Sequence, residues 1–154
     1  VSREIASLAW NLVKQLNYGL SLFDDVVPTL EALKKHGLTL GLISNINKNG
    51  VTLTSNLRLT PYIDFAITSK DVGSDKPHSP IFLAALEYAG AKAHETIHVG
   101  DQYSSDVEGA RGVGITPILI DRHDFHKDIN NCHRIRSLKE LVNLLVDRKH
   151  VLKE

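Results

Sequence analysis

The most informative pattern in the chain is the stretch Thr96-Ile97-His98-Val99-Gly100-Asp101-Gln102-Tyr103-Ser104-Ser105-Asp106. It reads as a short apolar strand that ends at Gly100-Asp101, followed by a turn of small residues that begins a helix. Ligands of open α/β folds bind at the carboxyl ends of the strands. The two carboxylates, Asp101 and Asp106, suit Mg²⁺, which prefers oxygen ligands. The alternative is structural: a Gly-Asp turn, and an acid placed for the helix dipole.

The composition describes an ordinary globular chain and excludes some partners. The 154 residues are 42% hydrophobic and 23% charged, which favours one domain with a sizeable core. A formal net charge of zero gives no basic footprint for nucleic acid or an anionic membrane, and no apolar run approaches the ~20 residues of a membrane span. The single cysteine, Cys132, fits a reducing compartment, so we expect a cytoplasmic protein.

Apolar spacing predicts alternating helices and strands. Helices are expected over residues 3–16, 28–36, 47–57, 79–89 and 106–111, and a last helix begins at the capping box Ser137-Leu138-Lys139-Glu140. Strands are expected over 38–43, 65–68, 96–100 and 115–120, the first buried on both faces, and a long polar loop over 122–136. This alternation predicts a Rossmann-like α/β fold of three layers, with a parallel sheet covered by helices on both faces.

Two other strand ends carry polar residues that belong on the same rim of the sheet. Ser44-Asn45 follows the first expected strand, where a hydroxyl and backbone amides can hold an oxyanion. Its alternative is an ordinary helix N-cap. Lys76-Pro77 precedes the helix over 79–89, and a lysine there can direct its ammonium at an anion. Its alternative is a solvated surface lysine.

Together these segments resemble a known family. Leu42-Ile43-Ser44-Asn45, then Lys76-Pro77, then Val99 through Ala110 resemble the second, third and fourth motifs of the haloacid dehalogenase-like (HAD) hydrolases. The resemblance covers roughly residues 22–148. It implies a HAD-like core and Mg²⁺-dependent chemistry of the phosphatase type on a small phosphorylated molecule, with a dehalogenase as the less expected activity.

The resemblance also implies a role for each matching residue. Ser44 would hydrogen-bond the transferring phosphoryl group, with help from the amide of Asn45. Lys76 would neutralise the phosphoryl charge. Asp101 would be a ligand of Mg²⁺, and Asp106 would either support the metal site or orient Lys76. Phosphoryl transfer needs this kind of positioning and positive charge more than protein acid–base chemistry.

One expected motif is not found. HAD hydrolases carry a nucleophilic aspartate after the first strand, in an apolar run followed by Asp-x-Asp. The only candidate here is Asp24-Asp25, whose adjacent carboxylates would point to opposite faces of an extended chain. We therefore expect a hydrolase core that lacks its nucleophile and is inactive alone. The alternative is a non-catalytic HAD-fold domain, a pseudo-enzyme or truncated product, that binds a partner or an anion.

The missing strand affects the expected architecture. Residues 1–20 would be a remnant of the family's cap or an N-terminal helix, which offers a surface for a homodimer, and residues 21–154 would be the core. The nucleophile strand normally lies between the strands that end at Ile43 and Val99. Without it, the sheet is incomplete at its first strand. Either the flanking strands pair directly, or another segment or protomer fills the space, or the chain is a piece of a longer protein.

One further group of residues suggests a metal. The loop after the last strand carries His123, His126, Cys132 and His133. Such side chains can bind zinc, but their spacing matches no standard site. We expect a solvated loop.

Overall fold

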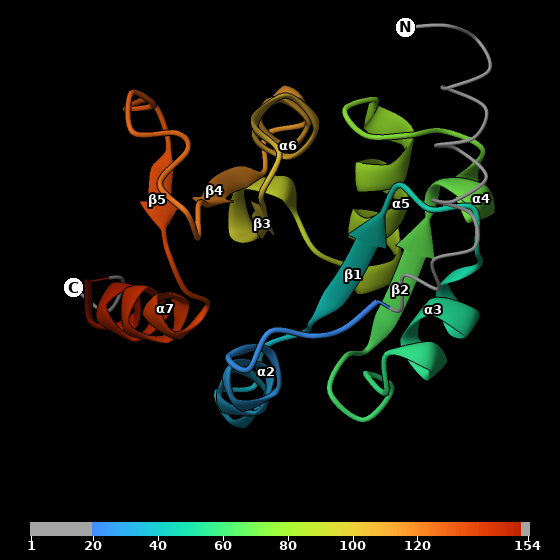
Figure 1. Ribbon diagram of the computed structural model, residues 1–154, viewed down its shortest axis with the longest axis horizontal. Coiled ribbons are helices and arrows are strands. Elements are labelled where there is room, and N and C mark those ends of the chain that lie inside the picture. The colour runs from blue at the N-terminus through green and yellow to red at the C-terminus, as the bar shows by residue number, and fades with distance from the viewer. Residues whose placement is uncertain (1–19, 152–154) are drawn as a thin grey trace, which may run out of the picture.

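Five strands form two separate parallel sheets in the computed structural model, which describes residues 20–151. Strand β1 (Gly41–Ser44) pairs with β2 (Phe65–Thr68). Strand β3 (Ile97–Gly100) pairs with β4 (Thr116–Ile120), which pairs with the short β5 (His133–Ile135). Figure 1 shows the two sheets beside each other. The helix predicted over residues 3–16 lies outside the described residues.

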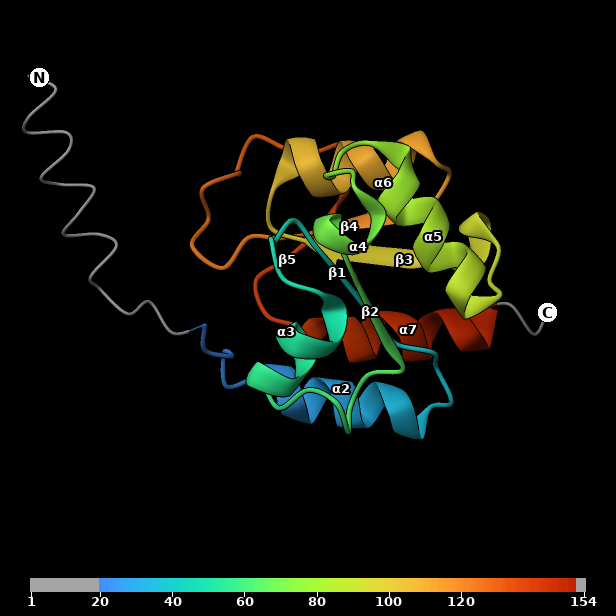
Figure 2. The same ribbon diagram turned by 90° about the vertical axis from the view of Figure 1, so that its right-hand side faces the viewer.

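Helices cover both faces, as the predicted α/β class requires. Helices α2 (Val26–Lys35) and α7 (Lys139–Val151) lie along one face, and α5 (Ser79–Ala89) and α6 (Gly109–Gly112) lie along the other (Figure 2). Helix α3 (Gly50–Asn56) packs against β2, and the single turn α4 (Ser69–Val72) follows that strand. No described helix combines the length and the apolar character that a membrane crossing needs.

Each helical layer has its own core. One is formed by Leu33, Ile118, Ile135 and Leu141, and the other by Ile81, Phe82, Ala110 and Ile115. The first core joins α2 and α7 to β4 and β5, and the second joins α5 to α6. Burial of an apolar stripe from each helix is what fixes the helices to the sheets.

The two sheets do not meet. Within residues 20–151, β1 pairs only with β2, and β3 pairs only with β4, so the first of the three alternatives, direct pairing of the flanking strands, is wrong, and the other two stay open. A cavity of about 460 Å³ lies between β1 and β3. No residue of either strand is fully buried, whereas Ile118 and Leu119 of β4 are. The expectation of a first strand buried on both faces is wrong for the same reason.

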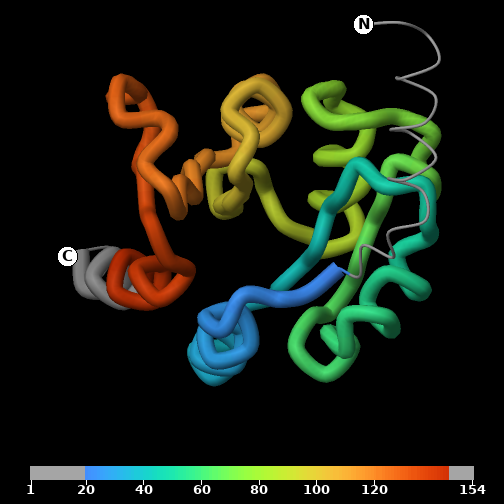
Figure 3. The backbone as a smooth tube through the Cα atoms, viewed as in Figure 1, coloured from blue at the N-terminus to red at the C-terminus, as the bar shows by residue number. Residues whose placement is uncertain are grey.

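The arrangement of the sheets explains this separation. The smooth trace in Figure 3 shows β1 and β3 as the two facing inner strands, with helices above and below. In Figure 2 β1 and β2 run diagonally while β3 runs almost horizontally. Neighbouring strands of a twisted sheet are rotated by about 20–25°. β1 and β3 differ visibly in direction, as expected for strands that are not nearest neighbours in a sheet.

Two predicted elements differ from the structure. The helix expected over residues 106–111 is a π-helical turn, η2 (Tyr103–Glu108), that leads into α6. π-Helical turns are rare and are often found at functional sites. The loop expected over 122–136 contains β5, because Ile135 is 1% exposed and its carbonyl accepts a hydrogen bond from Asp121 N at 2.8 Å. A three-residue strand of this kind is fixed by tertiary contacts, which a local pattern does not reveal.

Candidate active site

Lys76 and Asp106 form an ion pair between the end of β1 and the turn that follows β3. Lys76 Nζ lies 2.6 Å from Asp106 Oδ1 and 3.5 Å from the carbonyl oxygen of Ile43 near the end of β1. The side chains are only 12% and 4% exposed. The alternative of a solvated surface lysine is therefore wrong, because this ammonium is held in one place by β1 and by the turn after β3.

Asn45 fixes the backbone that carries Lys76. Its amide Nδ2 donates to the Lys76 carbonyl at 2.9 Å, and its Oδ1 accepts from the Lys76 N–H at 2.8 Å. The N-cap of α3 is Asn49, whose side chain accepts from Thr52 N. Ser44-Asn45 is therefore not the cap of the following helix. Ser44 is half-buried at the end of β1, where its hydroxyl lies on the rim predicted to bind an oxyanion.

Asp106 is the centre of the hydrogen bonding. Besides Lys76, Oδ1 contacts His98 Nε2 at 3.1 Å, and Oδ2 accepts from Gln102 N at 3.0 Å. Burial raises the pKa of Asp106, but the hydrogen bonds from His98, Lys76 and Gln102 outweigh it and hold the pKa well below its usual range. Asp106 is thus an anion at neutral pH, and a fixed partner for the lysine.

His98 is a site residue that the sequence analysis did not select. It lies in the middle of β3 between Ile97 and Val99, its side chain is 13% exposed, and its ring packs edge-on to Phe82 with centroids 5.3 Å apart. A polar residue inside an apolar strand requires a hydrogen-bond partner when it is buried. A histidine inside an apolar strand was therefore the feature of the sequence from which His98 and a carboxylate partner could have been identified.

Two glycines allow the elements around Asp106 and Lys76 to pack closely together. A Cβ on Gly100 would lie 2.1 Å from Asp106 Cγ, so only glycine lets the carboxylate pack against the end of β3. A Cβ on Gly109 would lie 2.7 Å from the Phe82 ring and 3.0 Å from Pro77 Cα. The second glycine brings α6 against α5 and the loop that carries Lys76. Both glycines belong to the motif-like segment Val99 through Ala110.

The two predicted Mg²⁺ ligands, Asp101 and Asp106, differ in whether their carboxylate oxygens already accept hydrogen bonds. Asp101 is exposed just after β3 and its carboxylate makes no hydrogen bond within residues 20–145. Asp106 already uses both oxygens, on Lys76, His98 and Gln102. Mg²⁺ in phosphoryl-transfer sites commonly takes one or two carboxylates and completes its shell with water and phosphate oxygens. Asp101 fits this requirement, whereas the bonding of Asp106 favours its second expected role, the orientation of Lys76.

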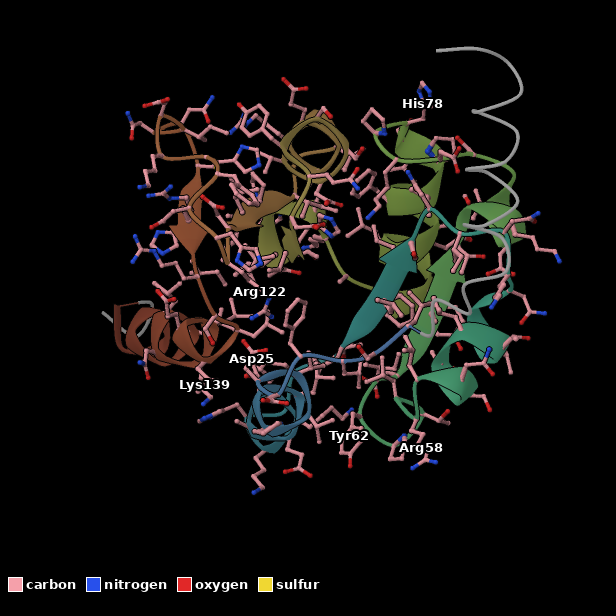
Figure 4. The ribbon with its side chains drawn as sticks, in the orientation of Figure 1. Asp25, Arg58, Tyr62, His78, Arg122 and Lys139 are labelled. Carbon is pink, nitrogen blue, oxygen red and sulfur yellow. The ribbon has the colours of Figure 1, made fainter. Side chains whose placement is uncertain are left out.

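Asp25, one of the two acids considered for the nucleophile, is fixed by hydrogen bonds to distant residues. Asp25 is 7% exposed at the start of α2 and accepts two hydrogen bonds from the Arg122 guanidinium, at 2.8 and 2.9 Å. Ser137 Oγ and Leu138 N also donate to it. In Figure 4 Asp25 lies close to Arg122 between α2 and the start of α7, while Asp24 is exposed. Asp25 joins distant parts of the chain, with Oδ2 accepting from Arg122, Ser137 and Leu138 and Oδ1 from Arg122.

The histidines and Cys132 of the loop after β4 are not clustered in the described structure. No three His, Cys, Asp or Glu side chains in the described part of the chain are grouped to hold a metal ion. The ring of His123 stacks on Phe125 instead, with centroids 5.5 Å apart. Burial raises the pKa of the Cys132 thiol, which disfavours the thiolate that zinc needs.

The fold and this rim define an α/β domain with a charged site at the ends of its central strands. The family model for haloacid dehalogenase-like hydrolases matches residues 4–120, and the chain belongs to that family. It therefore has the HAD-like fold that the three motifs predicted.

Individual relatives include two named phosphatases and one named dehalogenase. The chain is 33% identical over 135 residues to a glyceraldehyde 3-phosphate phosphatase from Methanocaldococcus jannaschii, covering 82% of this chain and 58% of that protein. A HAD phosphatase structure from Thermococcus onnurineus is 36% identical, with a TM-score of 0.72 over 80% of this chain and 58% of the other. A 2-haloacid dehalogenase structure from Pseudomonas syringae is 31% identical, with a TM-score of 0.76 over 94% and 62%. The chain thus spans less than two thirds of these relatives.

Proposed function

We propose that this chain is the phosphoryl-binding part of a Mg²⁺-dependent HAD phosphatase for a small phosphorylated molecule, and that its nucleophilic aspartate is not among the 154 residues. The observation that carries the proposal is the buried Lys76 ammonium, which is fixed by Asp106 while Asn45 holds the Lys76 backbone. Ser44 ends β1, and Asp101 directly follows β3. A site with a held cation, a hydroxyl and a free carboxylate suits a phosphoryl group and a metal. Two of the three relatives described above are named phosphatases, which supports the same class.

Each residue has a physical task in this proposal. The Ser44 hydroxyl and the Asn45 backbone amide donate to phosphoryl oxygens, and Lys76 neutralises their charge. Asp101 holds Mg²⁺, which supplies further positive charge at the phosphoryl group when bound. Asp106 moves no proton, because its pKa is far below neutral; it keeps the lysine directed at the rim. The neutral net charge and the single cysteine support a small-molecule substrate and a cytoplasmic location.

A non-catalytic role is the second candidate. It is favoured by the absence of an Asp-x-Asp sequence after an apolar strand in the 154 residues. Under this alternative the rim binds an anion or a partner but completes no reaction, even when a nucleophile strand is supplied.

The proposal is tested by binding and turnover with the full chain. We expect Mg²⁺-dependent binding of inorganic phosphate, measured by calorimetry, and no hydrolysis of p-nitrophenyl phosphate. Lys76→Met is expected to weaken phosphate binding at least about tenfold, a loss of ~1.4 kcal/mol. Lys92→Met, which removes an exposed cation before the opposite end of β3, is the matched control and should leave binding unchanged.

Two outcomes would contradict the proposal. Equal phosphate affinity of the wild type and Lys76→Met would show that Lys76 is not part of the phosphate-binding site. Hydrolysis by the 154 residues alone, abolished by Asp101→Ala and retained by the exposed-acid control Asp128→Ala, would show that a nucleophile is present after all.

A further inference from the structure

The π-helical turn η2 is bonded at its first residue to a distant part of the chain. Asn131 Nδ2 donates a hydrogen bond to Tyr103 Oη at 2.7 Å, across 28 positions of sequence. The turn directly follows Asp101 and Gln102, and it carries Asp106. This bond therefore joins the loop before β5 to the segment that carries both acids of the candidate site.

Asn131 contacts the same helical segment at a second point. Its backbone carbonyl accepts a hydrogen bond from Arg111 Nη2 at 2.9 Å. Arg111 lies in α6, which continues η2 without a break. One partner of Asn131 thus lies at the start of the π-helical turn and the other beyond its end, with Asp106 between them.

These two contacts oppose relaxation of the wide turn to an ordinary α-helix. A π-helix bonds each residue to the fifth one along, whereas an α-helix bonds it to the fourth and turns about 100° per residue. Relaxation would therefore rotate Tyr103 by about 100° relative to Arg111, and both could not stay bonded to Asn131. The same rotation would displace Gln102 N from Asp106 Oδ2, to which it donates at 3.0 Å.

Asn131 is itself held by the sheet. Only Cys132 separates it from β5, which pairs with β4. The other end of the loop is fixed by Asp121, whose carboxylate accepts hydrogen bonds from Phe125 N and His126 N. The partner of the π-helical turn is therefore anchored at both sides, and it can transmit the position of β5 to the turn.

We propose that Asn131 is a positioning residue of the candidate site. Its bond to Tyr103 keeps η2 wide, so that Asp106 is directed at Lys76 and Asp101 stays at the rim. Asn131 itself contacts neither phosphate nor metal in this proposal. Its effect on ligand binding rests on the proposed function, whereas its effect on the shape of η2 does not.

The test measures the full chain without and with ligand. Asn131→Ala removes the donor to Tyr103 Oη. Amide hydrogen exchange at Gln102 and Asp106, measured by NMR, should become about fivefold faster, which corresponds to ~1 kcal/mol. Exchange in β2, residues 65–68, should stay unchanged. Mg²⁺-dependent affinity for inorganic phosphate, measured by calorimetry, should fall about threefold or more.

Matched variants separate positioning from a general loss of stability. Tyr103→Phe removes the phenol oxygen from the other side of the same bond and should reproduce Asn131→Ala; it is also the milder change if Asn131→Ala does not fold. The double variant should exceed neither single one, because both delete one interaction. Asn131→Gln keeps an amide donor and should recover part of both losses. Asn130→Ala changes the exposed neighbour and should alter neither measurement.

Several results would overturn the proposal. They are unchanged exchange at Gln102 and Asp106 in both single variants, additive effects in the double variant, or equally faster exchange in β2. Unchanged phosphate affinity of Asn131→Ala beside a binding wild type would overturn it as well. A wild type that binds no phosphate counts against the proposed function alone, because the exchange rates of the ligand-free variants still decide whether Asn131 positions η2.

Discussion

The carboxylate of Asp106 packs directly against the Cα of Gly100, at a distance that leaves no room for a side chain at position 100. Gly100→Ala would place Cβ 2.1 Å from Asp106 Cγ and force the carboxylate away from Lys76. We expect a loss of about 1–3 kcal/mol in the free energy of unfolding, measured by urea denaturation, and loss of phosphate binding.

Gly112→Ala is the control for that substitution. Gly112 is the last residue of α6 and a Cβ there would meet no atom within 4 Å. It should be neutral or stabilise the chain by up to ~1 kcal/mol, because alanine favours helix over glycine. If Gly100→Ala behaves like Gly112→Ala, the close packing of Gly100 and Asp106 does not matter for stability.

Replacement of Asp25 should change how stability depends on pH. Hydrogen bonding to Arg122 is the largest influence on Asp25 and outweighs burial, so its pKa lies well below the ordinary 3.8. A lowered pKa stabilises the folded state above about pH 4, and that contribution is lost as the pH falls further. Asp25→Asn should therefore cost ~3 kcal/mol at pH 7, and the difference from the wild type should narrow toward pH 3.

Asp24→Asn removes the neighbouring exposed carboxylate without touching Arg122. Its stability should stay within about 0.5 kcal/mol of the wild type at every pH between 3 and 7. The measurement is chemical denaturation in a series of buffers. A constant gap between Asp25→Asn and the wild type across this range would contradict the assigned role of the ionised carboxylate.

His98 is expected to act through Asp106. His98→Leu leaves Asp106 Oδ1 with one partner fewer, and should cost about 1–2 kcal/mol of stability and weaken phosphate binding several-fold. His98→Gln keeps a donor and should recover part of both losses. The control is His94→Leu. The His94 side chain is 75% exposed and its Nε2 lies 3.9 Å from Glu95 Oε1, so loss of this weak surface contact should change little. An equal loss of phosphate binding in His98→Gln and His98→Leu would argue against positioning by this hydrogen bond.

Asp121 holds the loop before β5. It is 3% exposed and accepts hydrogen bonds from Phe125 N, His126 N and Arg134 Nη1. Asp121→Asn should release this loop. A loss of ~1.4 kcal/mol in the free energy of local opening would raise the rate of limited proteolysis within residues 122–130 about tenfold. Asp128→Asn, in the same loop but exposed, should leave the cleavage rate unchanged. Equal rates in the two variants would contradict this role.

The sequence predicted the parts of the fold and site that depend on local patterns. Apolar runs and the residues that follow them located β1, β2, β3 and β4, and three of the strand-end residues, Asn45, Lys76 and Asp106, lie in contact as one rim. The roles assigned to them stay predictions, because they require a ligand. Lys76 illustrates the limit: its position was predictable, but its burial depends on Asp106, 30 residues away.

Features that depend on distant contacts were not predictable. Asp25 and Arg122 are 97 residues apart, and nothing near either one indicates the other. The capping box at Ser137 is formed only in part: Glu140 accepts from Ser137 N, whereas Ser137 Oγ donates to Asp25 and accepts from Lys139 N. A hydroxyl that serves two partners cannot be assigned from the four-residue motif alone.

The cluster around Asp25 also has a consequence for the order in which the protein assembles during synthesis. Asp25 leaves the ribosome well before its partners Ser137 and Leu138, which lie 112 and 113 positions later. Contacts at such separation form late, because a long stretch of chain must be ordered first. Until then, α2 has neither α7 nor a partner for its buried acid, so a nascent chain exposes the apolar side of α2 to other proteins, including chaperones. Formation of this polar cluster is the step that brings α7 against α2 and covers its apolar side.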